Sequence, residues 1–396
     1  NDGTVWSWGY NYAGQLGNGI EVSNQRSPGP VIGLTDISTV VAGSGHTIAL
    51  ANTGTVWAWG ANDDGQLGTN EQFLNEWENY SVNPILVDGL TNITTADVGW
   101  THSVALQTDG TVWAWGGNEY GQLGDETTTS RHTPAQVIGL TDITAISTNH
   151  DHTVALKNDG TLWAWGDNEY GQLGDGTNIN RSIPVQVTNL TDVVAVAADN
   201  SYTIALTGDG SVWAWGRNQY GQLGNGDMVD HSTPVQVVGL QDVSIIAAGT
   251  NHGVALTGDG TVWSWGTNYD GQLGDGTTTN RTTPIQVAGL TDVAALSAGG
   301  GFSAALKTDG TLWGWGGDYG GELAQPIPPL APVEYFIDTG PFQTPSQLNL
   351  QRSHLNTHES VSAGENHTLV LKTDGTVWTW GYKIHNYGEL TALLAT

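Results

Sequence analysis

Residues 202–216 decide the fold of this chain and read YTIALTGDGSVWAWG. Two short apolar runs, residues 202–206 and 212–215, flank the pair Asp209 and Gly210. An Asp-Gly step between two such runs is a strong signal for a β-hairpin, because tight hairpin turns need residues that tolerate positive φ. The stretch therefore predicts two antiparallel strands joined at this pair.

Two further strands complete the unit around the hairpin. Residues 193–198 read VVAVAA and precede it, whereas residues 234–237 read PVQV and follow it after a polar loop. Proline cannot donate to a sheet ladder, so a strand that begins with Pro234 belongs at a sheet edge. The unit is a predicted four-stranded sheet, with strands A (193–198), B (202–206), C (212–215) and D (234–237).

This unit repeats along the chain. The motif DGTVWxWG, with small variations, has its glycine at Gly3, Gly54, Gly110, Gly160, Gly210, Gly260, Gly310 and Gly375. The copies hold all of the 18 tryptophans except Trp77 and Trp100. Four short strands per repeat without a helical period favour a radial β architecture. We expect the small residues of strand A at the centre and the tryptophans of strand C packed against the next blade.

Two other repeated motifs carry a family resemblance. Residues 115–124 read WGGNEYGQLG, and residues 42–50 read AGSGHTIAL. With this combination the chain resembles the regulator of chromosome condensation repeat family over nearly its whole length, which implies a seven-bladed propeller. The chain departs from the pattern at residues 321–324 and 388–390, where GELA and GEL stand in place of GQLG.

We therefore predict an all-β fold, a seven-bladed β-propeller of four-stranded antiparallel blades in one domain spanning residues 1–396. The N-terminal C and D strands and the C-terminal A, B and C strands are expected to share one blade and close the ring. The count gives 29 strands, one more than seven such blades hold, so one C strand has no assigned place. The expected repeats are residues 1–53, 54–109, 110–159, 160–209, 210–259, 260–309, 310–374 and, in part, 375–396, with insertions at 69–83 and 325–344.

The composition excludes several classes of function. The 396 residues carry 39 acidic and 10 Lys or Arg side chains, a net charge of −29, and no cysteine. This charge opposes nucleic acid or an anionic membrane as a partner, because phosphate recognition relies on clustered Lys and Arg. The lack of cysteine removes disulfides, thiolate metal sites and cysteine nucleophiles. We also expect no membrane-inserted segment.

No catalytic constellation is visible, so we expect a non-enzymatic protein without a cofactor. No nucleophile elbow and no phosphate-binding glycine loop before a helix occur. Structural calcium stays open as a weak alternative, without the usual Asp-rich spacing. Only His354 and His358 have a metal-like i, i+4 spacing, and that signal is weak without a helix or a third ligand.

The topology points to one face as the binding site. The A–B turns and C–D loops emerge at the same end of the blades, and there the repeats differ most from one another. One equivalent position reads Ser44, Trp100, His150, Asn200, Thr250, Gly300 and Glu365. We expect a protein partner to contact Trp77, Trp100, His150, Phe73, Tyr80, Tyr335, Phe336 and Phe342. The alternative is that the aromatic insertions fold back over the propeller or its seam.

Two rings of basic residues need a separate interpretation. Arg131, Arg181 and Arg281 each stand three residues before a proline, where they either grip carboxylates of a partner or pair with loop aspartates such as Asp125, Asp175 and Asp275. We favour the pairing. A structural ring, rather than a set of ligands, is expected for His46, His102, His152, His252 and His367, because Tyr202 and Phe302 occupy the same repeat position.

The leading hypothesis is a secreted or surface-displayed, bacterial-type interaction module, because strong acidity with few lysines suits a saline setting. Since the chain begins at Asn1, we expect it to be processed or cut from something longer. An inhibitor of an extracellular enzyme is an alternative, because the chain is similar in style to secreted β-lactamase inhibitory propellers. A carbohydrate-binding or adhesion module is another. Guanine nucleotide exchange, the activity for which the family is named, is disfavoured by the charge.

Overall fold

The computed structural model describes residues 5–9, 11, 13–20, 25–70, 79–317, 342–347, 358–363, 367–372 and 377–381. These residues form 29 β-strands, the predicted number, and no helix. Among them there is accordingly no helix with the length and apolar character needed to cross a bilayer. The all-β prediction is confirmed.

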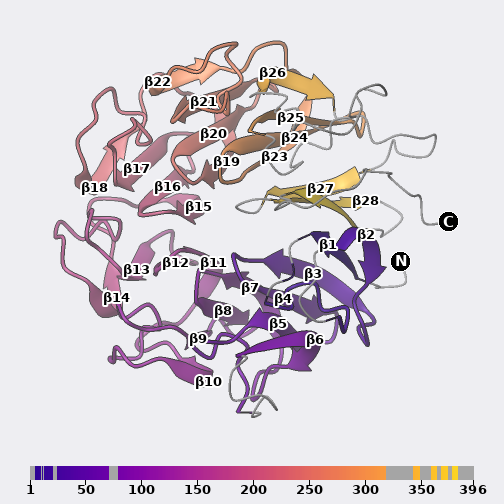
Figure 1. Cartoon of the computed structure of the whole chain (residues 1–396). Helices are drawn as coiled ribbons and strands as arrows, with labels where there is room; N and C mark the ends of the chain where they lie inside the picture. Colours follow the sequence, from indigo (N-terminus) through magenta and orange to yellow (C-terminus); the bar gives the residue numbers. More distant parts are fainter. Residues whose placement is uncertain are drawn as a thin grey trace.

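Six of the hydrogen-bonded sheets contain four antiparallel strands in the order A–B–C–D, as one repeat predicts. In Figure 1 the sheets follow one another around a ring, with the A strands toward the centre and the D strands at the rim. Neighbouring A strands lie side by side, as β11 and β15 do. The sheets are therefore arranged as the blades of a propeller.

Every strand falls into one of the four predicted classes. The A strands are β3 (Ile37–Ala42), β7 (Ile93–Val98), β11 (Ile143–Asn149), β15 (Val193–Asp199), β19 (Val243–Gly249), β23 (Val293–Ala298) and β27 (His358–Ala363). The B strands are β4 (His46–Ala51), β8 (His102–Gln107), β12 (His152–Lys157), β16 (Tyr202–Thr207), β20 (His252–Thr257), β24 (Phe302–Lys307) and β28 (His367–Lys372). The C strands are β1 (Trp6–Gly9), β5 (Val56–Ala61), β9 (Val112–Gly116), β13 (Leu162–Gly166), β17 (Val212–Gly216), β21 (Val262–Gly266), β25 (Leu312–Gly316) and β29 (Val377–Gly381). The D strands are β2 (Gln25–Pro30), β6 (Tyr80–Leu86), β10 (Arg131–Gln136), β14 (Arg181–Gln186), β18 (His231–Gln236), β22 (Arg281–Gln286) and β26 (Phe342–Gln347).

Residues 202–216 form the predicted hairpin, which consists of strands β16 and β17. These strands pair antiparallel, with Leu206 opposite Val212 and Tyr202 opposite Gly216. In the turn, the Asp209 carboxylate accepts the backbone N–H of Ser211 at 3.0 Å. Gly210 has a φ of +80°, which is the positive φ that the Asp-Gly step predicts.

The tryptophans of the C strands form the cores between blades. The second one of each pair is almost fully buried, at Trp59, Trp115, Trp165, Trp215, Trp265 and Trp315. Trp215 packs with Leu173, Val187 and Leu190 of the blade before its own. The tryptophans do lie between neighbouring blades, but the predicted direction was wrong, because they pack against the preceding blade and not the next one.

The motif WGxNxxGQLG folds into a loop that receives this tryptophan. In residues 168–174 the Asn168 side-chain oxygen accepts the N–H of Leu173 at 3.0 Å, and the Gln172 side-chain oxygen accepts the N–H of Tyr170 at 3.0 Å. The loop then presents the Gln172 backbone carbonyl to the indole N–H of Trp215 at 2.8 Å. Each repeat thus offers an acceptor to the blade that follows it.

The terminal strands form two separate hydrogen-bonded sheets. Strands β1 and β2 pair with each other, and β27, β28 and β29 form a three-stranded sheet. Cα atoms of β1 lie within 8 Å of Cα atoms of β29, and the two sheets are neighbours in Figure 1. No ladder joins them among the described residues, so one shared blade stays a prediction.

Candidate interaction surface

The A–B turns and C–D loops are joined by backbone hydrogen bonds within each blade. The N–H of Gly117 donates to the Thr101 carbonyl at 2.8 Å, and that of Asp167 donates to the Asp151 carbonyl at 2.9 Å. The same bond recurs between Arg217 and Ser201 at 2.9 Å. We call the surface made by these turns and loops the loop face.

Two of the predicted contact residues, Trp100 and His150, stack on each other in the loop face. Their ring centroids are 4.1 Å apart with an interplanar angle of 28°. The N–H of Trp100 also donates to the His150 carbonyl at 3.0 Å, across the boundary between two blades. Trp100 remains 47% exposed, so the pair is an aromatic platform open to solvent.

Local bonds fix the His150 side of the platform. His150 has a φ of +49°, which aims its carbonyl at Trp100. Its Nδ1 lies 2.8 Å from a carboxylate oxygen of Asp151, and the other oxygen of Asp151 accepts the Gln122 side-chain N–H at 3.0 Å. Gln122 belongs to the GQLG motif of the preceding blade, so the repeat scaffold positions the platform.

Several ionisable groups interact electrostatically with Asp151, the residue that bonds to His150 of the platform. The pKa of the Tyr120 hydroxyl is raised. The largest cause is the charge of Glu119, followed by burial and by the charges of Asp151, Asp167 and Glu169. Burial raises the pKa of Asp167, and Asp151 adds to that effect. Burial also raises the pKa of Asp64 in the neighbouring blade, with Asp63 as the next cause. This part of the loop face is acidic as well as aromatic.

Strand β7 adds a carboxyl group that the sequence analysis did not single out. Asp97 accepts the backbone N–H of Thr148 at 2.9 Å and that of Val98 at 3.0 Å. Burial raises the pKa of Asp97 to about 6. Because Thr148 lies on β11 of the next blade, Asp97 joins the two A strands that lead to Trp100 and His150.

The other predicted contacts have different outcomes. Tyr80 begins β6 opposite Ala61, at the edge of the loop face. Phe342 begins β26 opposite Gly316, and its side chain lies outside the described residues. Four contacts also lie outside the described residues, namely Phe73, Trp77, Tyr335 and Phe336. Both alternatives for the aromatic insertions therefore stay open.

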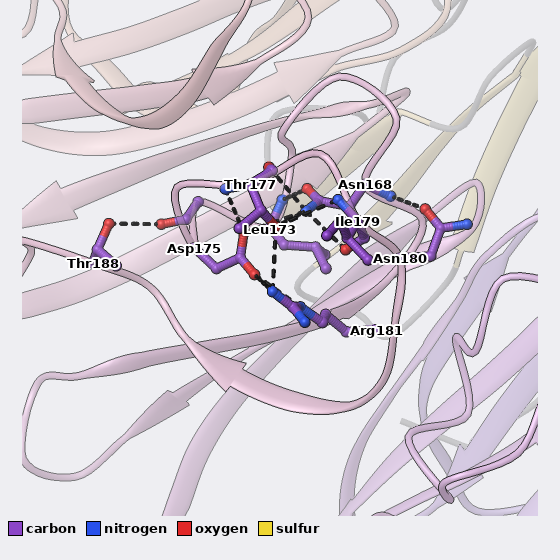
Figure 2. A network of polar contacts seen from close by, with 9 residues as sticks. Asn168, Leu173, Asp175, Thr177, Ile179, Asn180, Arg181 and Thr188 are labelled. Carbon is purple, nitrogen blue, oxygen red and sulfur yellow. Dashed lines mark hydrogen bonds and ion pairs between the residues drawn. The ribbon is translucent and has the colours of Figure 1, made fainter.

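Arg131, Arg181 and Arg281 pair with loop aspartates, which is the alternative that the sequence favoured. Arg181 lies 2.6 Å from the Asp175 carboxylate, Arg281 lies 2.6 Å from Asp275, and Arg131 bonds to Asp125. Figure 2 shows how the Arg181 pair continues through Thr177 to the buried Asn168. These guanidinium groups brace the C–D loops.

The histidine ring is structural where it is described. His152 is buried, and its Nε2 lies 3.1 Å from the Thr203 hydroxyl of the next blade. Equivalent contacts join His46 to Ser103 at 2.8 Å and His252 to Ser303 at 2.9 Å. Tyr202 instead donates its hydroxyl to the Gly249 carbonyl at 2.7 Å.

The weak i, i+4 spacing of His354 and His358 is not a helical pair. His358 lies in strand β27 rather than in a helix, and His354 lies outside the described residues. Within the described ranges no three His, Cys, Asp or Glu side chains gather as a metal site.

One charged residue on the loop face escaped the sequence analysis. Arg217 follows β17, and its guanidinium carbon lies 5.0 Å from the centroid of the Tyr170 ring. It occupies the third position of the WGxN motif, whereas the arginines singled out earlier precede a proline. The signal available in the sequence was the charge of Arg217, because the equivalent position holds Ala61 and Gly117 in two other repeats.

Comparison with known proteins identifies the family. Residues 1–304 match the profile of the RCC1-like domain, and residues 293–322 and 359–388 match the regulator of chromosome condensation (RCC1) repeat. The probable E3 ubiquitin-protein ligase HERC6 of Homo sapiens is 37% identical over 137 residues, which cover 34% of this chain and 13% of that protein. The chain thus matches only a small share of this curated relative.

Two solved structures share the fold over nearly the whole chain. The crystal structure of human WBSCR16 has a TM-score of 0.77 and 23% identity, and covers 93% of this chain and 100% of that one. Prp20p from Saccharomyces cerevisiae has a TM-score of 0.72 and 24% identity, and covers 96% of this chain and 92% of that one. At these identities the likeness shows the fold. Together with the profile match over residues 1–304, it shows that the chain belongs to the RCC1-like domain family.

Proposed function

We propose that the chain is a non-enzymatic interaction module that binds a protein partner through the loop face. The observation that carries this proposal is the exposed stack of Trp100 on His150, whose imidazole bonds to the Asp151 carboxylate. Large aromatic side chains that present a flat surface to solvent are typical anchors of protein interfaces. The Trp100 ring is already stacked on His150 and its backbone N–H is bonded to the His150 carbonyl, so less conformational freedom is lost on binding.

The chemistry of the surroundings favours a cationic segment of that partner. Asp151, which bonds to His150, acts together with Glu119, Asp167 and Glu169 to raise the pKa of Tyr120. An Arg or Lys side chain placed over an aromatic ring gains a cation–π contact, and nearby carboxylates add ion pairs. With a net charge of −29, the chain also attracts a basic partner at long range.

The relatives support an interaction role in general terms. Prp20p has binding properties toward Gsp1p and histones, and it shares the fold of this chain. HERC6 is described as a probable ligase, but the match spans 13% of that protein. Exchange on a small GTPase is a second candidate, because it would use the same fold, and the assay below separates the two.

The proposal includes a closed ring and an extracellular or cell-surface location. We propose that β1 and β2 complete the seventh blade together with β27, β28 and β29, which the proximity of β1 and β29 supports. Closure would make the loop face rigid. The location rests on the acidic composition alone. Inhibition of an extracellular enzyme and glycan binding stay as narrower alternatives.

A peptide-binding experiment tests the cationic partner. Fluorescence anisotropy is measured with three labelled peptides of equal length, in which glycine alternates with arginine, serine or glutamate. We expect the arginine peptide to bind far more tightly than the other two, and Trp100→Ala to weaken its binding about ten-fold or more, as for an interface anchor. Circular dichroism should show an unchanged fold, because the side chain is half-exposed.

A matched pair of charge variants guards against non-specific attraction. One variant carries Asp63→Asn, Glu119→Gln and Glu169→Gln on the loop face. The other carries Asp142→Asn, Asp192→Asn and Asp242→Asn on the D–A connections, where Asn92 already occupies the equivalent position with positive φ. Both lose three negative charges. Equal weakening by the two variants would contradict a site at the loop face.

The class of function is tested separately. Release of a fluorescent guanine nucleotide from Gsp1p is followed with and without the chain, and no acceleration is expected. Acceleration would overturn the non-enzymatic proposal and favour nucleotide exchange.

A further inference from the structure

Arg217 is held in a fixed place on the loop face. Its backbone N–H donates to the Ser201 carbonyl at 2.9 Å, which ties it to the A–B turn of its own blade. The next residue, Asn218, is fully buried and accepts the N–H of Leu223 at 3.0 Å. The backbone on both sides of the Arg217 side chain is therefore defined by the repeat.

Its charge has no ion-pair partner among the described residues. Arg131, Arg181 and Arg281 each bond to an aspartate of their own loop. Within the described ranges Arg217 takes part in no such ion pair, and its Nε is buried without a hydrogen-bond partner. Leaving a buried donor unsatisfied costs about 1–3 kcal/mol, more when it is charged. Of the four arginines whose side chains the structure describes, Arg217 alone lacks a carboxylate partner.

The same repeat position in the two neighbouring blades offers Arg217 no counterion. Asp167 occupies the same position one blade earlier, but its carboxylate accepts the Gln172 side-chain N–H at 2.7 Å and serves its own loop. Thr267 occupies the position one blade later, and its hydroxyl is buried and unpartnered. The repeat position thus gives Arg217 no fixed counterion.

Stacking orients the guanidinium group. Its carbon lies 5.0 Å from the ring centroid of Tyr170, which belongs to the preceding blade. Such a contact occupies one flat side of the guanidinium and fixes its plane. Because Nε is buried while the side chain as a whole is half-exposed, the two terminal nitrogens are the donors left for a ligand.

We propose that Arg217 is a binding site for a carboxylate group, which the terminal nitrogens bind in a bidentate manner. A planar carboxylate matches the planar fork of donors. A phosphate dianion fits less well, because one guanidinium offsets only part of its charge and the neighbouring blade carries Asp167 and Glu169. The ligand class is therefore a monoanionic carboxylate, such as an Asp or Glu side chain of a protein.

This site does not depend on the proposed function, although it would refine it. Blades with Trp100 and His150 present carboxylates, whereas the blade with Arg217 presents a cation. A partner with a basic group and a carboxylate at matching spacing would bind in one orientation only.

Nuclear magnetic resonance of arginine side chains tests the site with small probes. Protein labelled with nitrogen-15 at arginine is titrated with sodium acetate, and separately with inorganic phosphate, at an ionic strength kept constant with sodium chloride. We expect a saturable shift of the Arg217 Nε–H signal with acetate, and no matching shift for the ion-paired Arg181. Equal shifts of both signals, no saturation, or tighter binding of phosphate would overturn the proposal.

Variants at the stacking residue make the test independent of misfolding. Tyr170→Phe should keep the acetate affinity, whereas Tyr170→Ala should weaken it about two- to five-fold through loss of the cation–π contact. Arg217→Lys serves to assign the signal, because this variant lacks the Nε–H resonance of residue 217 and should leave the Arg181 signal unchanged. Equal affinity of the two Tyr170 variants would show that the ring does not position the guanidinium.

Discussion

The indole N–H of Trp165 donates to the backbone carbonyl of Gln122, 2.9 Å away in the preceding blade. The same bond joins Trp115 to Gln66 at 2.9 Å and Trp215 to Gln172 at 2.8 Å. The bond links the WxWG motif of one repeat to the GQLG motif of the repeat before it. Neither motif is complete without the neighbouring blade.

We expect Trp165→Phe to lower the free energy of unfolding by about 1–2 kcal/mol, because it removes this bond while most of the buried ring remains. Trp165→Ala should cost about 3–5 kcal/mol. Trp163→Phe is the matched control, since the Trp163 Nε1 is buried without a partner and its loss should be nearly neutral. Denaturant unfolding measures all three, and an equal effect of the two Phe variants would contradict the role of the bond.

Gly174→Ala should destabilise the protein more than Gly239→Ala. Both glycines have positive φ, +69° and +79°, so an alanine is strained by about 1 kcal/mol at either site. A Cβ at Gly174 would also lie 2.8 Å from the Trp215 Nε1, whereas one at Gly239 meets nothing within 4 Å. The difference between the two melting temperatures reports the steric part. Identical melting temperatures would rule out close packing at the GQLG loop.

Acid should unfold the protein through its buried histidines. Burial lowers the pKa of His152 to about 3 and that of His252 to about 4, from 6.5 in the unfolded chain. Below pH 6.5 the unfolded state binds protons that the folded state does not, so stability is lost as the pH falls toward 4. At pH 5 each such histidine costs about 2 kcal/mol. The pKa of about 6 at Asp97 and the raised pKa values of Asp64 and Asp167 act in the opposite direction.

The variant His252→Phe isolates this effect, because Phe302 already occupies the same repeat position in this chain. Unfolding free energies are measured at several values between pH 7 and pH 4. We expect the variant to show a shallower loss of stability than the wild type. A slope that does not change would mean that other groups govern acid unfolding.

Asp175→Ala should cost more stability than Arg181→Ala. Asp175 accepts the N–H and the hydroxyl of Thr177 at 2.9 and 2.7 Å as well as the Arg181 guanidinium. Removing it leaves the buried end of the loop without its acceptor, at about 1–3 kcal/mol. Removing the partly exposed guanidinium should cost about 1 kcal/mol or less. Equal effects in denaturant unfolding would indicate that the ion pair alone holds the loop.

The repeat motifs were sufficient to predict the blade. The Asp209-Gly210 step, the edge proline at Pro234 and the small residues of strand A predict the order of four strands, which β15 to β18 show. The aspartates six residues before Arg181 and Arg281 predict the ion pairs. These features are local, or they recur at a fixed period, so a single sequence contains them.

The candidate site was only partly predictable. Trp100 and His150 stood out because they differ from the equivalent residues of other repeats, but their stacking depends on a backbone at His150 with positive φ. Arg217 was missed, since its significance lies in an absent partner, and that is visible only once the loops are folded. The two aromatic insertions follow no repeat, so no periodicity constrains them.

Each of these indole hydrogen bonds runs from a buried tryptophan to a carbonyl of the preceding blade. The bonds around the ring therefore all point in the same direction along the chain. A blade receives its acceptor from the segment that precedes it in the chain, as Trp59 does from Gln15. During synthesis the acceptor loop therefore leaves the ribosome before the tryptophan that needs it. Each new blade can dock on a finished template, whereas a fragment that starts in the middle of the chain lacks the template for its first blade.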